Sequence, residues 1–140
     1  MLLHIIARGK IGQSPEADLV DRYLKRLTMP HRVTELPDRG GKLTPAGPGT
    51  VTVLLDEKGK QLGSMDFARR IEGWRDGGTR ECRFLIGAAD GFDDADRATA
   101  DLLIAFGAMT WPHMMARAML AEQLWRSCSI LAGHPYHREG

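Results

Sequence analysis

Side chains that can bind phosphate, stack on a base and move protons gather near the C-terminus of this 140-residue chain. Four of them follow the last predicted helix: His134, Tyr136, His137 and Arg138. A second group, Met109-Thr110-Trp111-Pro112-His113, precedes that helix, which also carries Arg117. Because a polar cluster beyond the last helix can reach out of its own core, the pattern indicates a functional site. A solvated tail without a function is the alternative.

Metal, nucleophile and nucleotide motifs are weak or missing. His134 and His137 are three residues apart, which can suit a metal ion, but no second Cys or His pair has zinc-like spacing, so no metal site is expected. No Ser-His-Asp arrangement is evident. The chain also lacks the dinucleotide fingerprint and the Gly-x-x-x-x-Gly-Lys-Ser/Thr phosphate loop, which argues against NAD and ATP as ligands.

Composition favours one soluble, cytoplasmic domain spanning residues 1–140. Net charge is +1, from 19 basic and 18 acidic residues, so any RNA contact needs a local basic patch. Cys82 and Cys128 are too few for a disulfide framework, and we expect both to be buried and reduced. The longest nearly apolar stretch, Leu102–Trp111, is about half the length that a membrane span requires.

Short apolar segments alternate with amphipathic ones, a pattern typical of an α/β domain with a mostly parallel sheet and flanking helices. The predicted strands are 2–7, 32–36, 50–56, 82–87 and 105–111. The predicted helices are 15–27, with Ser14 as N-cap, 64–75, capped by Ser64, 93–103 and 114–131. Residues 37–49, rich in Pro and Gly, are a predicted loop.

Ligands of open parallel sheets gather beyond the carboxyl ends of the strands. Three such ends are conspicuous: 55–60, 86–91 and 109–113. A nucleotide-like cofactor could lie across all three, held by backbone groups of the glycine-containing loops. Each signal is weak alone, because Gly87 can simply permit a turn and Asp56 can simply cap one.

Four motifs, in order and spacing, resemble those of the RlmH (YbeA-like) ribosomal RNA methyltransferases of the SPOUT class. They are Leu55-Asp56-x-x-Gly59-Lys60, Ile86-Gly87-x-x-Asp90-Gly91, Met109-Thr110-Trp111-Pro112-His113 and His134-Pro135-Tyr136-His137-Arg138. The resemblance runs from Leu2 to the C-terminus. It implies a homodimer and a SPOUT-like fold whose C-terminal trefoil knot holds the cofactor bent. The implied reaction is S-adenosyl-L-methionine-dependent methylation of N3 of a pseudouridine in 23S ribosomal RNA (rRNA), within the assembled ribosome.

The resemblance also assigns residues. The implied cofactor contacts are Leu55, Gly87, Phe106, Gly107, Ala108, Met109, Thr110 and Trp111. In the tail, His134 or His137 is expected to accept the N3 proton, Tyr136 to stack on the base, and Arg138 to hold phosphate or the anionic imide. His113 and Arg117 are expected to orient the substrate or to bridge subunits.

Two departures from the family pattern keep other functions open. Only the short 37–49 loop stands where the family usually has an additional helix, and Ala88 replaces a glycine, which would be strained if that position needs a positive φ. A non-catalytic ribosome-associated protein of the same fold is one alternative. A transfer RNA methyltransferase is another, although those commonly carry extra RNA-binding segments that this chain lacks.

Overall fold

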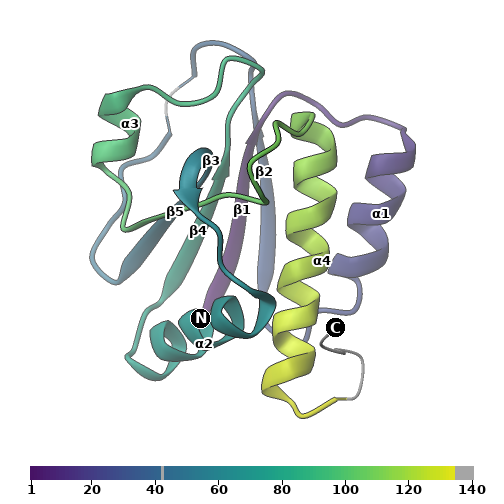
Figure 1. Cartoon of the computed structure of the whole chain (residues 1–140), viewed down its shortest axis with the longest axis vertical. Helices are drawn as coiled ribbons and strands as arrows, with labels where there is room; N and C mark the ends of the chain where they lie inside the picture. Colours follow the sequence, from purple (N-terminus) through teal and green to yellow (C-terminus); the bar gives the residue numbers. More distant parts are fainter. Residues whose placement is uncertain (42, 135–140) are drawn as a thin grey trace.

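A five-stranded parallel sheet forms the centre of the protein in the computed structural model, which describes residues 1–41 and 43–134 (Figure 1). The strand order is β2-β1-β4-β3-β5, and every neighbouring pair is parallel. The strands are β1 Leu2–Arg8, β2 His31–Leu36, β3 Thr50–Lys60, β4 Glu81–Ile86 and β5 Leu102–Ile104. The helices are α1 Pro15–Leu24, α2 Ser64–Asp76, α3 Asp94–Ala98 and α4 His113–Leu131. The predicted α/β class with a parallel sheet is confirmed.

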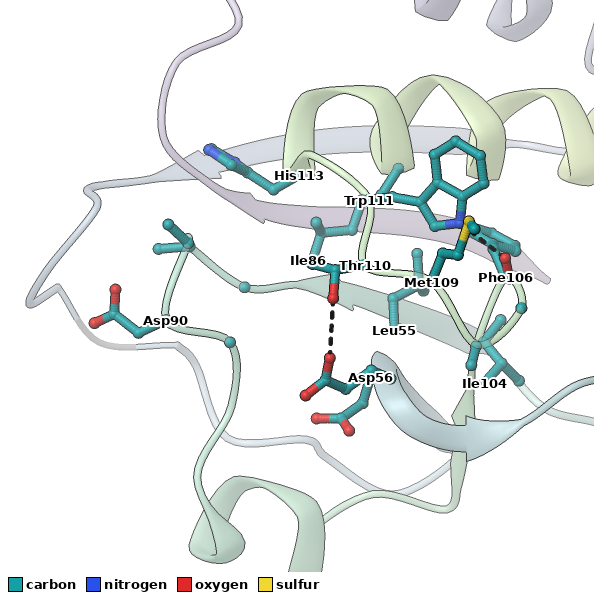
Figure 2. A pocket seen from close by; sticks show the side chains of 18 of the residues that line it. Leu55, Asp56, Ile86, Asp90, Ile104, Phe106, Met109, Thr110, Trp111 and His113 are labelled. Atoms are coloured by element: carbon teal, nitrogen blue, oxygen red, sulfur yellow. Dashed lines mark hydrogen bonds between the residues drawn. The ribbon is translucent and has the colours of Figure 1, made fainter.

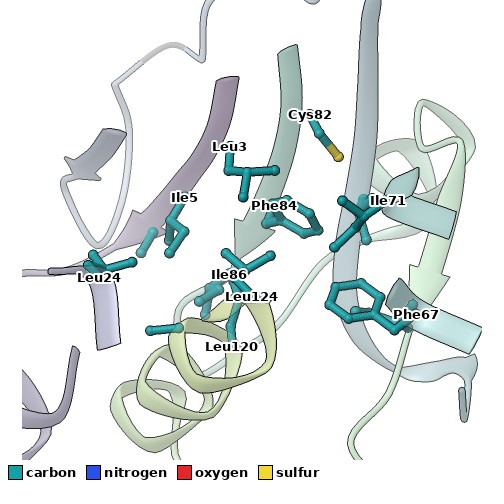
Figure 3. Packing of buried hydrophobic residues seen from close by; sticks show 14 of the residues in the cluster. Leu3, Ile5, Leu24, Phe67, Ile71, Cys82, Phe84, Ile86, Leu120 and Leu124 are labelled. Atoms are coloured by element: carbon teal, nitrogen blue, oxygen red, sulfur yellow. The ribbon is translucent and has the colours of Figure 1, made fainter. Parts of the chain in front are cut away.

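The sheet buries apolar side chains on both faces. Leu3, Ile5 and Phe84 pack with side chains of α1, α2 and α4 in the main core (Figure 3). Alternate positions point the other way: Ile6, Leu54 and Leu85 form a second cluster, which Leu43, Phe92 and Ala100 from the loops cover. A strand buried on both faces reads as a continuous apolar run, which is why β1, β3 and β4 were predictable from sequence.

The predicted third helix and last strand are wrong. Residues 93–103 form only the short α3, and the segment 105–111 is a loop, while the strand is Leu102–Ile104. The reason lies in tertiary contacts, because β5 pairs with β3 and its start is fixed by Asp101. The Asp101 amide donates to the Thr52 carbonyl, and the Thr52 amide donates to the Asp101 carboxylate, both at 2.8 Å.

The predicted helix ends need smaller corrections. Ser14 caps α1 as expected, accepting from the Ala17 amide at 3.0 Å, but α1 ends at Leu24 instead of residue 27. Ser64 does not cap α2: Gly63 occupies the N-cap position without a side-chain bond. The Ser64 hydroxyl instead donates to Gln123 Oε1 of α4 at 2.9 Å, so it joins two helices.

Strand β3 runs past its predicted end because its backbone meets β5 twice. Leu55 and Lys60 both pair with Ile104, and the residues between them bulge out of register. Gly59 lies so close to β5 that a Cβ there would stand 2.5 Å from the Ile104 carbonyl carbon. The Ala105 amide then donates to the Lys60 carbonyl at 3.0 Å. This contact fixes where the loop after β5 begins.

An ion pair between a buried arginine and a partly exposed glutamate fastens the first part of α4 to the sheet. Arg117 is 1% exposed; its Nη1 donates to Glu35 Oε2 of β2 at 2.5 Å, and its Nη2 to the Gly9 carbonyl at 3.1 Å. Burial raises the pKa of Glu35, but the hydrogen bonds from Arg117 and the Ile11 amide outweigh the effect of burial, so the pKa of Glu35 is lowered.

The two cysteines, Cys82 and Cys128, are free and buried, as predicted.

Gly59→Ala is expected to destabilise the fold by about 3 kcal/mol or more, because the added methyl meets backbone atoms that cannot rotate away. Gly73→Ala is the matched control. It lies inside α2, where a Cβ would meet nothing within 4 Å beyond the helix's own backbone, so it should be neutral or stabilising by up to about 1 kcal/mol. Urea unfolding of both variants measures the difference. Equal stability of the two would contradict the close β3–β5 contact.

Candidate functional site

A pocket lies at the carboxyl ends of β3, β4 and β5 (Figure 2). Three chain segments line it: Leu55 to Glu57 where the bulge of β3 begins, Ile86 to Gly91 from the last residue of β4 onward, and the loop that follows β5. Leu55, Ile86 and Ile104 contribute an apolar surface where these strands end, while the loops add backbone amides and carbonyls. The pocket therefore occupies the place where parallel α/β sheets usually bind ligands.

The predicted cofactor residues meet at this pocket. Those that line it are Leu55, Gly87, Phe106, Gly107, Met109, Thr110 and Trp111. Ala108 belongs to the same loop but does not line the pocket. The structure thus brings together side chains that are more than fifty positions apart in sequence, such as Thr110 and Glu57, which are separated by 53 positions.

The loop from Ala105 to Pro112 is shaped by a contact within the loop and by one with β3. The Trp111 indole N–H donates to the Phe106 carbonyl at 2.8 Å, and the Thr110 hydroxyl donates to Glu57 Oε2 at 3.3 Å. Gly107, with φ +99°, provides the turn that brings these groups together. Met109 is left 78% exposed at the rim. The loop therefore presents both backbone groups and apolar side chains to the pocket.

The loop after β4 makes a tight turn, in which the Gly91 amide donates to the Ala88 carbonyl at 2.9 Å. A Cβ on Gly87 would stand 3.3 Å from the Gly91 backbone, and Gly91 itself has φ +74°. Ala88 does not have a positive φ, since only glycines among the described residues do. The strain considered for alanine at this position is therefore absent.

An ion pair forms part of the pocket wall. Arg97 Nε of α3 donates to Asp56 Oδ2 at 3.0 Å, and Arg97 Nη1 to Asp94 Oδ1 at 2.9 Å. The Asp56 bond, supported by Asp94, raises the pKa of the Arg97 guanidinium. Asp56 Oδ1 accepts from the Lys58 amide at 2.9 Å. The turn-capping role considered for Asp56 is therefore present, together with a partner that the sequence did not suggest.

The remaining predicted site residues lie in different places. His113, at the start of α4, lines the pocket, and its Nδ1 is buried with no hydrogen-bond partner among the described residues. Arg117 does not line the pocket; the contacts described above hold it inside the fold. His134 is exposed just beyond α4, and its amide donates to the Ser129 carbonyl at 2.8 Å. Tyr136, His137 and Arg138 lie outside the described residues.

Several pocket residues were not predicted, notably Arg97, Ile104 and Ala105. Ile104 and Ala105 were missed because the strand was placed too late in the sequence. Arg97 gave no sequence signal, since its partner Asp56 is 41 positions away.

Over residues 1–41 and 43–134, no group of three or more His, Cys, Asp or Glu side chains is arranged to hold a metal ion. In the same part of the chain, no helix combines the length and apolarity needed to cross a membrane.

The chain is similar to known proteins over its whole length. A family model described as "Predicted SPOUT methyltransferase" matches residues 1–137. A ribosomal RNA large subunit methyltransferase H of Rhizorhabdus wittichii is 73% identical over 140 residues, covering both chains completely. Proteins of the same name from Sphingopyxis alaskensis and Paramagnetospirillum magneticum are 64% and 49% identical, each covering at least 99% of both chains. The chain therefore belongs to the SPOUT methyltransferase family.

Proposed function

We propose that this protein uses S-adenosyl-L-methionine to methylate N3 of a pseudouridine in the 23S rRNA of the assembled ribosome, in the cytoplasm. Family membership supports methyl transfer, and the names of the relatives support the large-subunit rRNA as substrate. The observation that carries the proposal is the pocket at the ends of β3, β4 and β5. It is lined by nearly all the residues that the motifs assign to the cofactor.

The pocket residues fit S-adenosyl-L-methionine. Leu55, Ile86 and Ile104 offer an apolar surface for adenine, and the two loops offer backbone donors and acceptors for its edge and for the ribose. Gly87 keeps the first loop free of a side chain that would press on the Gly91 backbone. When bound, the cofactor supplies a methyl group on a positively charged sulfur, an electrophile that needs neither a metal nor a protein nucleophile.

The protein's own tasks are then alignment and proton removal. N3 lies between two carbonyl groups and keeps its proton at neutral pH. We assign the proton acceptor to His134 or His137, whose imidazole titrates near neutrality. Tyr136 stacks on the base, and Arg138 binds phosphate or the anionic imide. His113, which lines the pocket at the start of α4, orients the substrate.

A homodimer with a C-terminal trefoil knot completes the proposal. Exposed apolar side chains support the homodimer: Leu19 of α1, Met109 and Trp111 of the loop, and Met115 of α4. Soluble monomers rarely leave many such residues uncovered together. A near-neutral subunit would also gain a local basic surface if Arg22, Lys25 and Arg26 of α1 lay beside the partner's tail.

Wild-type protein should transfer radiolabelled methyl from S-adenosyl-L-methionine to ribosomes that lack the modification, and the label should map to N3 of one pseudouridine in 23S rRNA. Cofactor binding without label would indicate a non-catalytic protein. Label only on transfer RNA would indicate a transfer RNA methyltransferase.

In the same assay, the variants His137→Ala and His134→Ala identify the proton acceptor. Replacing the histidine that accepts the proton should lower turnover by about 10²-fold or more, while the Kd for the cofactor stays nearly constant.

Met115→Glu should shift the protein from dimer to monomer in sedimentation velocity experiments, because a carboxylate would be buried in the interface. Val33→Glu is the control. Val33 is 37% exposed, similar to the 40% of Met115, but lies on the edge strand β2, so this variant should stay dimeric. A wild-type monomer at micromolar concentration would contradict the proposed dimer.

A further inference from the structure

The ion pair between Asp56 and Arg97 joins two parts of the pocket wall that share no strand pairing. Asp56 lies in the bulged end of β3 and its side chain is only 3% exposed, while Arg97 belongs to α3 and is 21% exposed. Both residues line the pocket. The family motifs give neither residue a role toward the cofactor.

The segment that carries Arg97 has few other attachments. α3 contains five residues, none of them buried, and its capping box between Asp93 and Asp96 is internal to the helix. Phe92 and Ala100 pack on the second apolar cluster at either end of the segment. Among the described residues, the bond from Arg97 to the buried Asp56 is the side-chain hydrogen bond that joins the segment between Phe92 and Ala100 to the sheet.

The second partner of Arg97 does not provide an equivalent link. Asp94 lies on α3 itself and its side chain is 96% exposed, so this pair is local and screened by solvent. Asp56, in contrast, is held in place by its second oxygen, which accepts from the Lys58 amide. The Asp56 carboxylate is therefore a fixed anchor, and Arg97 is the side chain that reaches it.

We propose that Arg97 is a positioning residue: its bond to Asp56 holds the segment from Ala88 to Arg97 against the end of β3 and so keeps the cofactor pocket in its binding shape. The inference rests on the proposed function, since it assigns the pocket to S-adenosyl-L-methionine. Loss of the bond leaves the Asp56 carboxylate buried without its cation, which favours opening of the wall to water.

The first test uses hydrogen–deuterium exchange of the full-length protein without cofactor. Arg97→Gln should speed exchange of backbone amides in residues 88–101 by about tenfold, the change that a 1.4 kcal/mol shift in a local opening equilibrium produces. Protection in β1, β4 and α4 should not change. Asp94→Asn is the matched control and should match wild type. Unchanged exchange in Arg97→Gln, or an equal effect of Asp94→Asn, would overturn the proposal.

The second test measures binding of S-adenosyl-L-methionine by calorimetry and steady-state methyl transfer to ribosomes. In Arg97→Gln the Kd should rise about tenfold while kcat at saturating cofactor stays near the wild-type value. Arg97→Lys, which keeps the charge, should recover part of the affinity and remains informative if the glutamine variant folds poorly. An unaltered Kd in Arg97→Gln would refute the inference.

These measurements distinguish failure of the proposed function from failure of the positioning role of Arg97. If wild-type protein binds no S-adenosyl-L-methionine, the proposed function fails, and with it the assignment of Arg97 to that cofactor, whatever the exchange data show. If wild type binds the cofactor and Arg97→Gln matches it in both exchange and affinity, the proposed function stands and only the positioning role of Arg97 fails.

Discussion

The close contact between Gly59 and Ile104 governs the geometry of the pocket. At this point the extended end of β3 meets β5 without room for a side chain, and the Ala105 amide is bonded to the Lys60 carbonyl. Because β5 has only three residues, it depends on this pairing and on the Asp101–Thr52 bonds at its start. The loop from Ala105 to Pro112 therefore leaves the sheet at a defined place and direction.

Contacts at the two ends of that loop determine the shape of the pocket. The Trp111 indole bonds back to Phe106, and α4 begins directly afterwards at His113. Helix α4 is held in turn by buried Arg117, which reaches Glu35 and the Gly9 carbonyl across the sheet edge. On the α3 side of the pocket, the bond between Arg97 and Asp56 joins the wall to the end of β3. One wall is thus fixed by backbone pairing, whereas the other joins the sheet through an ion pair and the packing of Phe92 and Ala100.

Sequence patterns predicted the elements whose burial is intrinsic to their own residues. β1, β3 and β4 are apolar runs, and Ser14-Pro15 marks the start of α1. The apolar run Leu102–Trp111 misled the prediction, because only its first three residues pair with β3, while the rest form a loop whose residues, except Ala108, line the pocket. Ser64 likewise looks like a helix cap but has a partner, Gln123, that is 59 positions away. Contacts at such separation leave no local pattern.

The candidate site was predicted mainly through the resemblance of its motifs, not through periodicity. That resemblance named eight cofactor residues between Leu55 and Trp111, and the structure brings all of them except Ala108 to the pocket lining. It gave no indication of the ion pair, because Asp56 has a recognisable motif and Arg97 does not. The chemistry of a ligand site was thus readable in the sequence, whereas the contacts that stabilise its walls required the fold.

The most direct test of this account is a crystal structure of the protein with S-adenosyl-L-methionine. We expect cofactor density in the pocket at the ends of β3, β4 and β5, in contact with Leu55, the loop after Gly87 and the loop from Phe106 to Trp111. Density for the cofactor at another place on the protein, with this pocket empty, would contradict it.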